Sequence, residues 1–440
     1  MSAKRLSAST LLAIALAVAT APAFALLVEQ FSNPNAEPAK PPAKETPYQA
    51  KLREGMTALL GGKLDAAEGA LNAAAKLDAK AYAPWLGLAE LAVRRGRPAD
   101  AEKFAAQAIS IAPKSAEAAT GAGRVALVVG KHTEAEKHFQ AATALDPKFI
   151  QARLDLADLQ VNTDRAREAA QGYRAAIGVD PKHAGAYFGL GRALVRLGEP
   201  AEAVKSFEKS GELAPANPLP WMALSEVHTG AKAYDKAAAA LDGALKAAPE
   251  YLPARLAKGD LWAVRGDPKR ALVEYNEILT TAQGPVAGQV HSKIGMLHQA
   301  QKRPDDADKS YEAAIKADSN AAVAYNNRAW LAADRKRDLN EALVWAKKAV
   351  ELAPKGATFH DTLATVYLAR NEADPALAAA RTAVGLAPGA PDYHYRLGLA
   401  LELKKQNAEA VQAFQKAIEL KKDFPDAPDA RRRIDALGRR

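Results

Sequence analysis

The sequence contains no cysteine. This absence excludes a disulfide framework, a thiol nucleophile, a cysteine zinc site and a lipidated cysteine behind an export signal. Aromatic residues make up only 6% of the chain, so any core must be built mainly from small and aliphatic side chains. After the N-terminal region, no apolar run approaches the ~20 residues that a membrane-spanning helix requires. We therefore expect a mature chain without a transmembrane anchor.

The N-terminal residues have the pattern of an export signal. Lys4 and Arg5 precede a short apolar stretch at 10–19, and small residues follow it. Cleavage after Ala23 and cleavage after Ala25 both fit this pattern. A retained signal anchor is the competing interpretation, but the apolar stretch is too short to span a bilayer. The sequence therefore predicts an exported protein, and a bacterial periplasm is the expected location.

The net charge is +9, from 60 basic and 51 acidic residues. Basic residues are interspersed with acidic ones along most of the chain, which is typical of a solvated surface. Nucleic acid is not an expected partner, because an exported protein without a clustered basic face lacks the necessary electrostatic footprint.

A period of 34 residues dominates the chain from about residue 48 onward. The residues that repeat at this interval are prolines at Pro113, Pro147, Pro181, Pro215 and Pro249, alanines at Ala101, Ala135, Ala169, Ala203, Ala237 and Ala271, and glycines at Gly62, Gly96, Gly130, Gly198 and Gly266. A proline at constant phase ends one helix and starts a connection. A glycine at constant phase suits a left-handed residue after a helix. Each unit is therefore predicted to be a helix, a glycine turn, a second helix and a proline connection.

The stretch from Ala186 to Pro215 carries an aromatic residue, Leu-Gly, alanine, a second aromatic residue and proline at fixed offsets. The matching residues are Tyr187, Leu190, Gly191, Ala203, Phe207 and Pro215. This pattern resembles the tetratricopeptide repeat (TPR) family. The resemblance implies an all-α fold, a right-handed α-solenoid or superhelix whose concave groove binds a partner.

Eleven repeats are predicted on this frame. They begin at Tyr48, Tyr82, Ala116, Ile150, Ala184, Pro218, Leu252, Gly288, Ala322, Ala357 and Pro391. The phase slips by two residues near Gly284 and Pro285, where the helical pattern breaks, and by one residue in the turn 333–342. The predicted organisation is a signal peptide at 1–25, a linker at 26–47, repeats at 48–287 and 288–424, and a capping helix with a basic tail at 425–440.

No pattern for catalysis or metal binding emerges. The H-E-x-x-H motif of zinc proteases is absent, and the glycine-rich stretch 121–130 lies within a predicted first helix rather than after a strand. His360 and His394 occupy the same phase in adjacent repeats and are interpreted as packing residues. We therefore predict a protein without cofactor, metal or enzymatic activity.

The repeat frame predicts which first-helix residues face the groove. These partner-binding candidates are Glu90, Arg94, Arg124, Asp155, Asp158, Phe188, Arg192, Arg196, Glu226, Asp260, Met296, Asn326, Asn327, Trp330, Asp361, Tyr395 and Arg396. The cluster of Phe188, Arg192 and Arg196 can in principle pair with a carboxylate and pack an apolar side chain. Each candidate has the alternative interpretation of a solvated surface residue.

The functional hypothesis is a non-enzymatic scaffold that binds a peptide or protein partner in the cell envelope. The stretch from Asn326 to Pro388 resembles a repeat pair common in exported bacterial repeat proteins, several of which act in envelope assembly or exopolysaccharide secretion. The first alternative is therefore a component of polysaccharide export that binds glycan through Trp330 and Tyr395 or bridges the export machinery. The second is a hydrolase with an unrecognised site, although no residues remain for a separate catalytic domain.

Overall fold

A computed structural model describes residues 45–438 of the chain. The predicted signal peptide, both of its cleavage sites and most of the predicted linker lie outside the described residues. Every regular element between residues 45 and 438 is an α-helix. The predicted all-α class is therefore confirmed.

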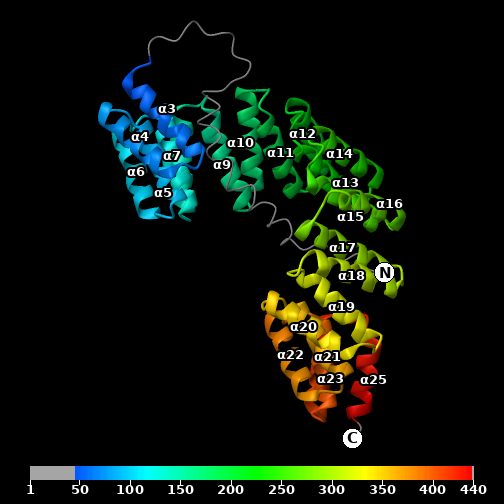
Figure 1. The fold of residues 1–440 in the computed structure, drawn as a ribbon. Helices are drawn as coiled ribbons and strands as arrows, with labels where there is room; N and C mark the ends of the chain where they lie inside the picture. Colours follow the sequence, from blue (N-terminus) through cyan, green and yellow to red (C-terminus); the bar gives the residue numbers. More distant parts are fainter. Residues whose placement is uncertain (1–44, 439–440) are drawn as a thin grey trace. The chain divides into compact units, whose positions relative to one another are not determined.

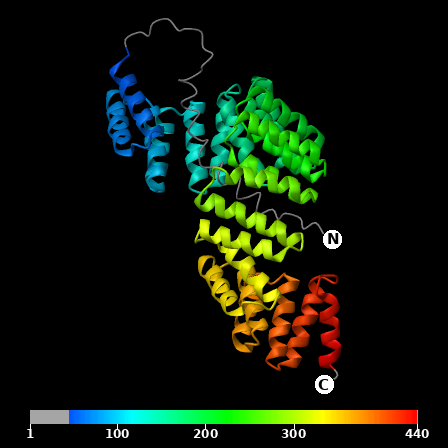
Figure 2. The ribbon, with the colours of Figure 1, turned by 45° about the vertical axis from the view of Figure 1, so that its right-hand side comes forward.

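The helices form two compact units that meet between Pro220 and Trp221. The first unit contains five helical hairpins, whose paired helices run side by side (Figure 1 and Figure 2). Their bounds are α3 (Pro47–Leu60) with α4 (Leu64–Leu77), α5 (Ala83–Arg94) with α6 (Pro98–Ile111), α7 (Ala116–Val128) with α8 (His132–Leu145), α9 (Ile150–Asn162) with α10 (Ala166–Val179), and α11 (Ala184–Leu197) with α12 (Pro200–Leu213).

The second unit continues the alternation of first and second helices and ends in a single additional helix. Its elements are α13 (Leu219–Gly230, which begins two residues before the boundary), α14 (Tyr234–Ala247), α15 (Leu252–Arg265), α16 (Pro268–Leu279), α17 (Gly284–Ala300), α18 (Pro304–Ala317), α19 (Ala322–Asp334), α20 (Leu339–Leu352), α21 (Ala357–Ala369), α22 (Ala373–Leu386), α23 (Pro391–Leu403), α24 (Asn407–Leu420) and α25 (Ala427–Gly438). The last helix packs on α24 and covers the end of the stack, as the sequence predicts for a capping helix.

The turns within the hairpins explain the glycine period. The five glycines at this phase all have positive φ, from 67° at Gly96 to 83° at Gly266. Six other repeats place a residue with a side chain at the same point, and these residues are Asp164, Lys232, Lys302, Lys336, Asn371 and Lys405. Packing of the two helices therefore imposes the left-handed conformation even where the residue does not favour it.

The first phase slip takes a different form from the one predicted. Helix α17 begins at Gly284, four residues before the predicted repeat start at Gly288, and is 17 residues long. Pro285 lies in its first turn, where the missing amide of proline costs no hydrogen bond. The extra residues thus lengthen the helix instead of forming a connection. The second slip lies in the turn as predicted, where Lys336 and Asp338 both have a φ of 50°.

The alanines that recur at 34-residue intervals lie in the core of the hairpins. Ala203 and its equivalents in the other repeats are fully buried. Beside them, a second-helix ring lies directly over a first-helix glycine: a Cβ added to Gly191 would lie 2.5 Å from Phe207 Cε1. Gly123 has the same relation to Phe139, which confirms that the glycine-rich stretch in α7 has a packing role. Small residues therefore let the two helices approach each other while the ring fills the space beside them.

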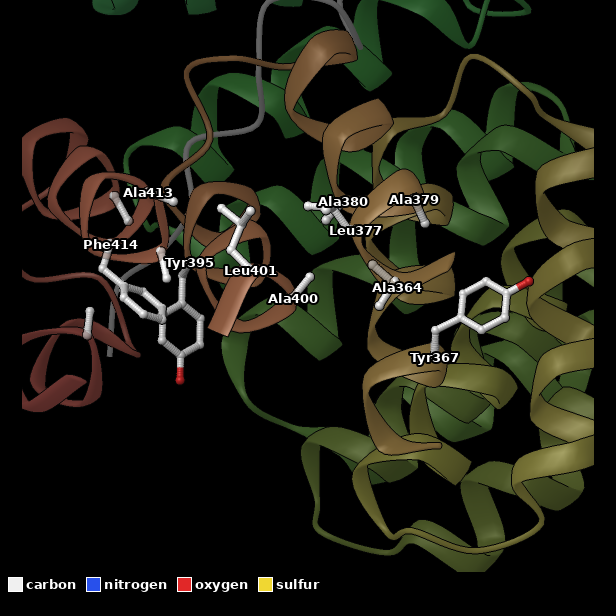
Figure 3. Packing of buried hydrophobic residues seen from close by; sticks show 14 of the residues in the cluster. Ala364, Tyr367, Leu377, Ala379, Ala380, Tyr395, Ala400, Leu401, Ala413 and Phe414 are labelled. Carbon is white, nitrogen blue, oxygen red and sulfur yellow. The ribbon is translucent and has the colours of Figure 1, made fainter. Parts of the chain in front are cut away.

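The core of the last repeats shows this packing at close range. The rings of Tyr395 and Phe414 lie next to each other, with centroids 5.7 Å apart, and Leu401 packs nearby (Figure 3). Ala364 and Ala380 belong to the same cluster and are fully buried. Short side chains thus build a continuous core between neighbouring hairpins.

Candidate partner-binding wall

In each unit, the first helices of successive hairpins approach one another directly. In the first unit α3, α5, α7, α9 and α11 contact each other in sequence, and in the second unit α17, α19, α21 and α23 do so. Among the described helices, no two second helices pack against each other to a comparable extent. The row with the closer spacing lies on the inner side of a stack. We call the exposed face of the first helices the inner wall, and the predicted partner-binding residues lie on these helices.

Two of the predicted residues in the first unit form an ion pair across neighbouring helices. Arg124 of α7 lies with its Nε 2.5 Å from Asp155 Oδ2 of α9. Gln151 Nε2 also donates to Asp155 Oδ1 at 2.7 Å. The carboxylate of Asp155 is thus held on both sides by other residues of the wall.

Asp158 is fixed from a different direction. The hydroxyl of Tyr173, a second-helix residue, donates to Asp158 Oδ1 at 2.6 Å. Arg192 of the next first helix lies 3.5 Å from the same oxygen. The carboxylate therefore links its own hairpin to the following one.

Two predicted arginines fasten a first helix to the preceding one. Arg94 Nη1 donates to the carbonyl of Leu59 at 2.7 Å, and Arg196 Nη1 donates to the carbonyl of Val161 at 2.6 Å. These carbonyls lie in the last helical turn, where no backbone partner exists within the helix and a cation is favoured. Arg94 also pairs with Glu90 at 2.9 Å.

The cluster of Phe188, Arg192 and Arg196 is consequently engaged within the wall. Arg196 also lies 3.2 Å from Asp164, and the ring of Phe188 lies 5.7 Å from that of Phe207. A partner carboxylate would have to compete with these internal contacts. In the first unit, the charges on the wall mainly connect one repeat to the next.

The second unit repeats the tyrosine and aspartate arrangement. The hydroxyl of Tyr275 donates to Asp260 Oδ1 at 2.5 Å, and Lys293 Nζ of α17 lies 2.8 Å from both oxygens of that carboxylate. Burial, with a further contribution from Asp260, raises the pKa of Tyr275, so the phenol remains a donor. Lys293 was not among the predicted residues, although its place on α17 one turn before Met296 could have indicated it.

The middle of this wall offers apolar and amide groups. Met296 is 51% exposed and Trp330 is half-buried beside the ring of Tyr311. Asn326 is buried and donates through Nδ2 to Asn327 Oδ1 at 3.1 Å. Exposed methionine and tryptophan are side chains that commonly anchor a partner.

The remaining predicted residues lie on α13, α21 and α23. Glu226 is exposed on α13. Asp361 of α21 is only 8% exposed, and Arg396 Nε of α23 lies 3.5 Å from its Oδ1. Burial raises the pKa of Asp361 to about 6, because the nearby guanidinium offsets only part of the cost of desolvation.

Tyr395 lies in the packed core instead of presenting its ring to the groove. Its ring lies next to that of Phe414 (Figure 3) and to that of Phe424, and its hydroxyl donates to Asp429 Oδ2 of α25 at 2.7 Å. Phe414 lies on α24 and Phe424 precedes α25, whereas the capping helix supplies Asp429. Of the two aromatic residues in the polysaccharide hypothesis, Trp330 is therefore the less buried one.

His360 and His394, which occupy the same position in adjacent repeats, make the same contact. His360 Nε2 lies 2.9 Å from the carbonyl of Pro354, and His394 Nε2 lies 2.8 Å from that of Pro388. Arg153 makes the same contact with the proline carbonyl of its own connection. Across residues 45–438, no three His, Cys, Asp or Glu side chains are grouped as metal ligands.

One pocket among the described residues was not predicted. It has a volume of ≈ 360 Å³ and lies between α18, α19 and α20. Arg328 crosses it, with the guanidinium 4.2 Å from the ring centre of Trp345 and Nε 2.8 Å from Asp308. The sequence gives no signal for it, because residues from three helices form it.

Comparison with known proteins gives a consistent result. The family profile described as "Tetratricopeptide repeat" matches residues 52–116, 120–174, 154–218, 229–287, 292–357 and 362–433. A comparison with curated protein sequences finds no significant match. None of the helices described in the structure combines the length and the apolar character needed to cross a membrane.

Several solved structures are similar in fold. Yeast Tom70 is 14% identical, with 90% of this chain and 96% of that chain covered and a TM-score of 0.47. PilF of Pseudomonas aeruginosa is 14% identical over 49% of this chain and 97% of that chain, with a TM-score of 0.41. PilW, described as a type IV pilus biogenesis factor, is 20% identical over 47% of this chain and 96% of that chain, with a TM-score of 0.42.

Proposed function

Because the chain belongs to the tetratricopeptide repeat family, whose members mediate protein–protein interactions, we propose that it is a non-enzymatic scaffold that binds a peptide or protein partner along its inner wall. The observation that carries this proposal is the close row of first helices, which presents side chains from successive repeats on one surface. A partner laid along this surface meets a new set of side chains at every repeat.

The middle of the wall in the second unit is the part best suited to hold a partner side chain. Met296 is half-exposed on a first helix, and Trp330 lies on the next one. Burial of such side chains by a partner removes apolar surface from water and supplies most of the affinity in typical interfaces. The charged residues on the inner wall of the first unit are paired with one another. They would therefore orient the partner more than they would increase its affinity.

We place this activity in the bacterial cell envelope. The support is the N-terminal sequence, in which two basic residues precede a short apolar stretch and small residues. An exported scaffold would meet partners in the periplasm, and cysteine-free repeats avoid mispairing there.

Site-specific photo-crosslinking in the native compartment tests the proposal. A benzophenone amino acid replaces Met296 on the inner wall, and in a matched variant it replaces Val273 on the second helix α16, which is 65% exposed. We expect protein adducts from position 296 and few from position 273. Equal adducts from both positions, or adducts only from position 273, would contradict a partner site on the inner wall.

A polysaccharide partner is the alternative, and the partial exposure of Trp330 on a first helix favours it. Sugar rings stack on exposed aromatic faces, so a glycan would depend strongly on this side chain. In this case, Trp330→Ala should abolish retention of exopolysaccharide in a pull-down, and the protein adducts at position 296 should be absent.

A further inference from the structure

The wall at the C-terminal end of the second unit carries more negative than positive charge. Arg396 Nε of α23 lies 3.5 Å from Asp361 Oδ1 of α21, and Asp392 of α23 and Asp426, which directly precedes α25, lie near enough to raise the pKa of Asp361. We call these three aspartates the acidic cluster. The other arginines of this region are engaged elsewhere: Arg433, for example, contacts Glu402 and Asp429.

One carboxylate oxygen of this cluster is buried without a hydrogen bond. Asp361 is 8% exposed, and its Oδ1 accepts no hydrogen bond from any described residue. The nearest cation, Arg396, approaches only to 3.5 Å, and its Nε likewise makes no hydrogen bond within residues 45–438. A buried charged oxygen in this state costs free energy that a new donor would recover.

The chemistry of the cluster selects the kind of donor. Carboxylates only accept hydrogen bonds, so a complementary group must be a donor and preferably a cation. The three aspartates are not arranged to share one metal ion, because no three metal-ligating side chains are grouped in that way among residues 45–438. An ammonium or guanidinium group fits the charge and the missing hydrogen bond together.

Burial also disfavours the ionised form of these carboxyl groups. It raises the pKa of Asp361 to about 6 and also raises the pKa of Asp426. In both cases desolvation is the largest cause, Arg396 lowers the pKa and Asp392 raises it. A bound cation would lower both values by stabilising the ionised form.

We propose that the acidic cluster binds a lysine or arginine side chain of the partner, at the C-terminal end of the inner wall. This inference rests on the proposed function, because it assumes that a peptide lies along the first helices. It adds the chemical class of one partner residue and assigns that residue to α21, α23 and the start of α25. On the same helices, the hydroxyls of Thr358 and Tyr393 lie 3.0 Å apart and can contact the partner backbone.

The net charge of the protein makes this preference testable. A chain with a charge of +9 repels cationic peptides at long range and attracts anionic ones. Tighter binding of a basic peptide must therefore come from a local site. Fluorescence anisotropy of labelled (Ala-Arg)4 and (Ala-Glu)4 with the full-length protein measures this difference directly.

Neutral variants of the cluster provide the decisive comparison. We expect (Ala-Arg)4 to bind the unmodified protein at least tenfold more tightly than (Ala-Glu)4 does. The double variant Asp361→Asn, Asp426→Asn should bind (Ala-Arg)4 roughly 10–100-fold more weakly, which is the effect expected when hydrogen bonds to charged groups are lost. The control combines Glu277→Gln with Glu341→Gln, which makes the same change of charge on second helices of the same unit. This control should bind (Ala-Arg)4 as the unmodified protein does.

Three outcomes would overturn the inference. The first is equal affinity of the protein for the two peptides, and the second is unchanged affinity of the aspartate variant for (Ala-Arg)4. The third is displacement of (Ala-Arg)4 by spermidine at a concentration equal to that of the peptide, because this would indicate a site for a free polyamine. Circular dichroism of the variant checks that the helices are retained. If position 296 crosslinks to a partner while the acidic cluster shows no preference for (Ala-Arg)4, this inference fails and the proposed function stands.

Discussion

Replacement of Asp361 by asparagine should stabilise the protein at neutral pH. Burial raises the pKa of this carboxyl from its ordinary value of 3.8 to about 6. The native state therefore binds the proton more tightly than the unfolded state does. Above pH 6 both states are ionised, and the native state bears the cost of a buried charge.

The pKa shift sets the size of the effect. A difference of about 2 pKa units, at 1.36 kcal/mol each, corresponds to about 3 kcal/mol. The free energy of unfolding should fall as pH rises from about 4 to about 6 and should remain lower above that range. Asparagine resembles the protonated acid, so Asp361→Asn should remove this loss. The variant should be more stable than the unmodified protein at pH 8 by up to about 3 kcal/mol, and nearly equal to it at pH 4.

Hydrogen exchange measured by mass spectrometry is the appropriate assay, because a repeat array can unfold in parts and a single midpoint then has no clear meaning. Peptides from α21 and α23 should exchange more slowly in the variant at pH 8, and peptides from α5 and α6 should be unchanged. Faster exchange in α21 would refute the reasoning, since it would show that Arg396 stabilises the ionised form by more than burial costs. A variant that is more stable but binds (Ala-Arg)4 more weakly would indicate that the charge is retained for binding.

Four further changes test the packing and the turns of the hairpins, each by the local free energy of unfolding that hydrogen exchange of peptides from the changed hairpin measures. Ala203→Leu should overfill a fully buried helix crossing and lower the free energy of unfolding by about 1–3 kcal/mol; unchanged stability would show that the crossing has spare room. Gly191→Ala places a Cβ 2.5 Å from Phe207 and should cost a similar ~1–3 kcal/mol, so a neutral result would contradict the close contact. Gly198 and Lys302 both have the left-handed conformation, with φ of 75° and 59°. Gly198→Ala should therefore lower the free energy of unfolding by ~1–2 kcal/mol, and Lys302→Gly should raise it by ~0.5–1 kcal/mol. Effects of the same sign in this last pair would refute the role assigned to backbone conformation.

The repeat architecture could be predicted because every hairpin must bury the same contacts at the same phase. Ala203 and Phe207 are buried as expected, and the glycine turns adopt the left-handed conformation that their spacing suggests. The start of α17 was less predictable, because Gly284 and Pro285 suit the first turn of a helix as well as a break. Local signals of this kind determine the helix type more firmly than the helix boundary.

The contacts of the wall residues could not be predicted in the same way. Arg196 bonds to a carbonyl 35 residues earlier, and Lys293 bonds to a carboxylate 33 residues earlier. Such contacts depend on how neighbouring helices cross, and a repeat frame does not specify this. Tyr395 shows the same limit, since its hydroxyl bonds to a carboxylate 34 residues later, in the capping helix.

Hydrogen exchange of the full-length protein with and without its crosslinked partner tests the central claim most directly. If the inner wall binds the partner, protection should appear in peptides from α17, α19, α21 and α23. Peptides from the second helices α16, α18 and α22 should exchange at their original rates. Protection confined to the second helices would contradict a partner site on the inner wall.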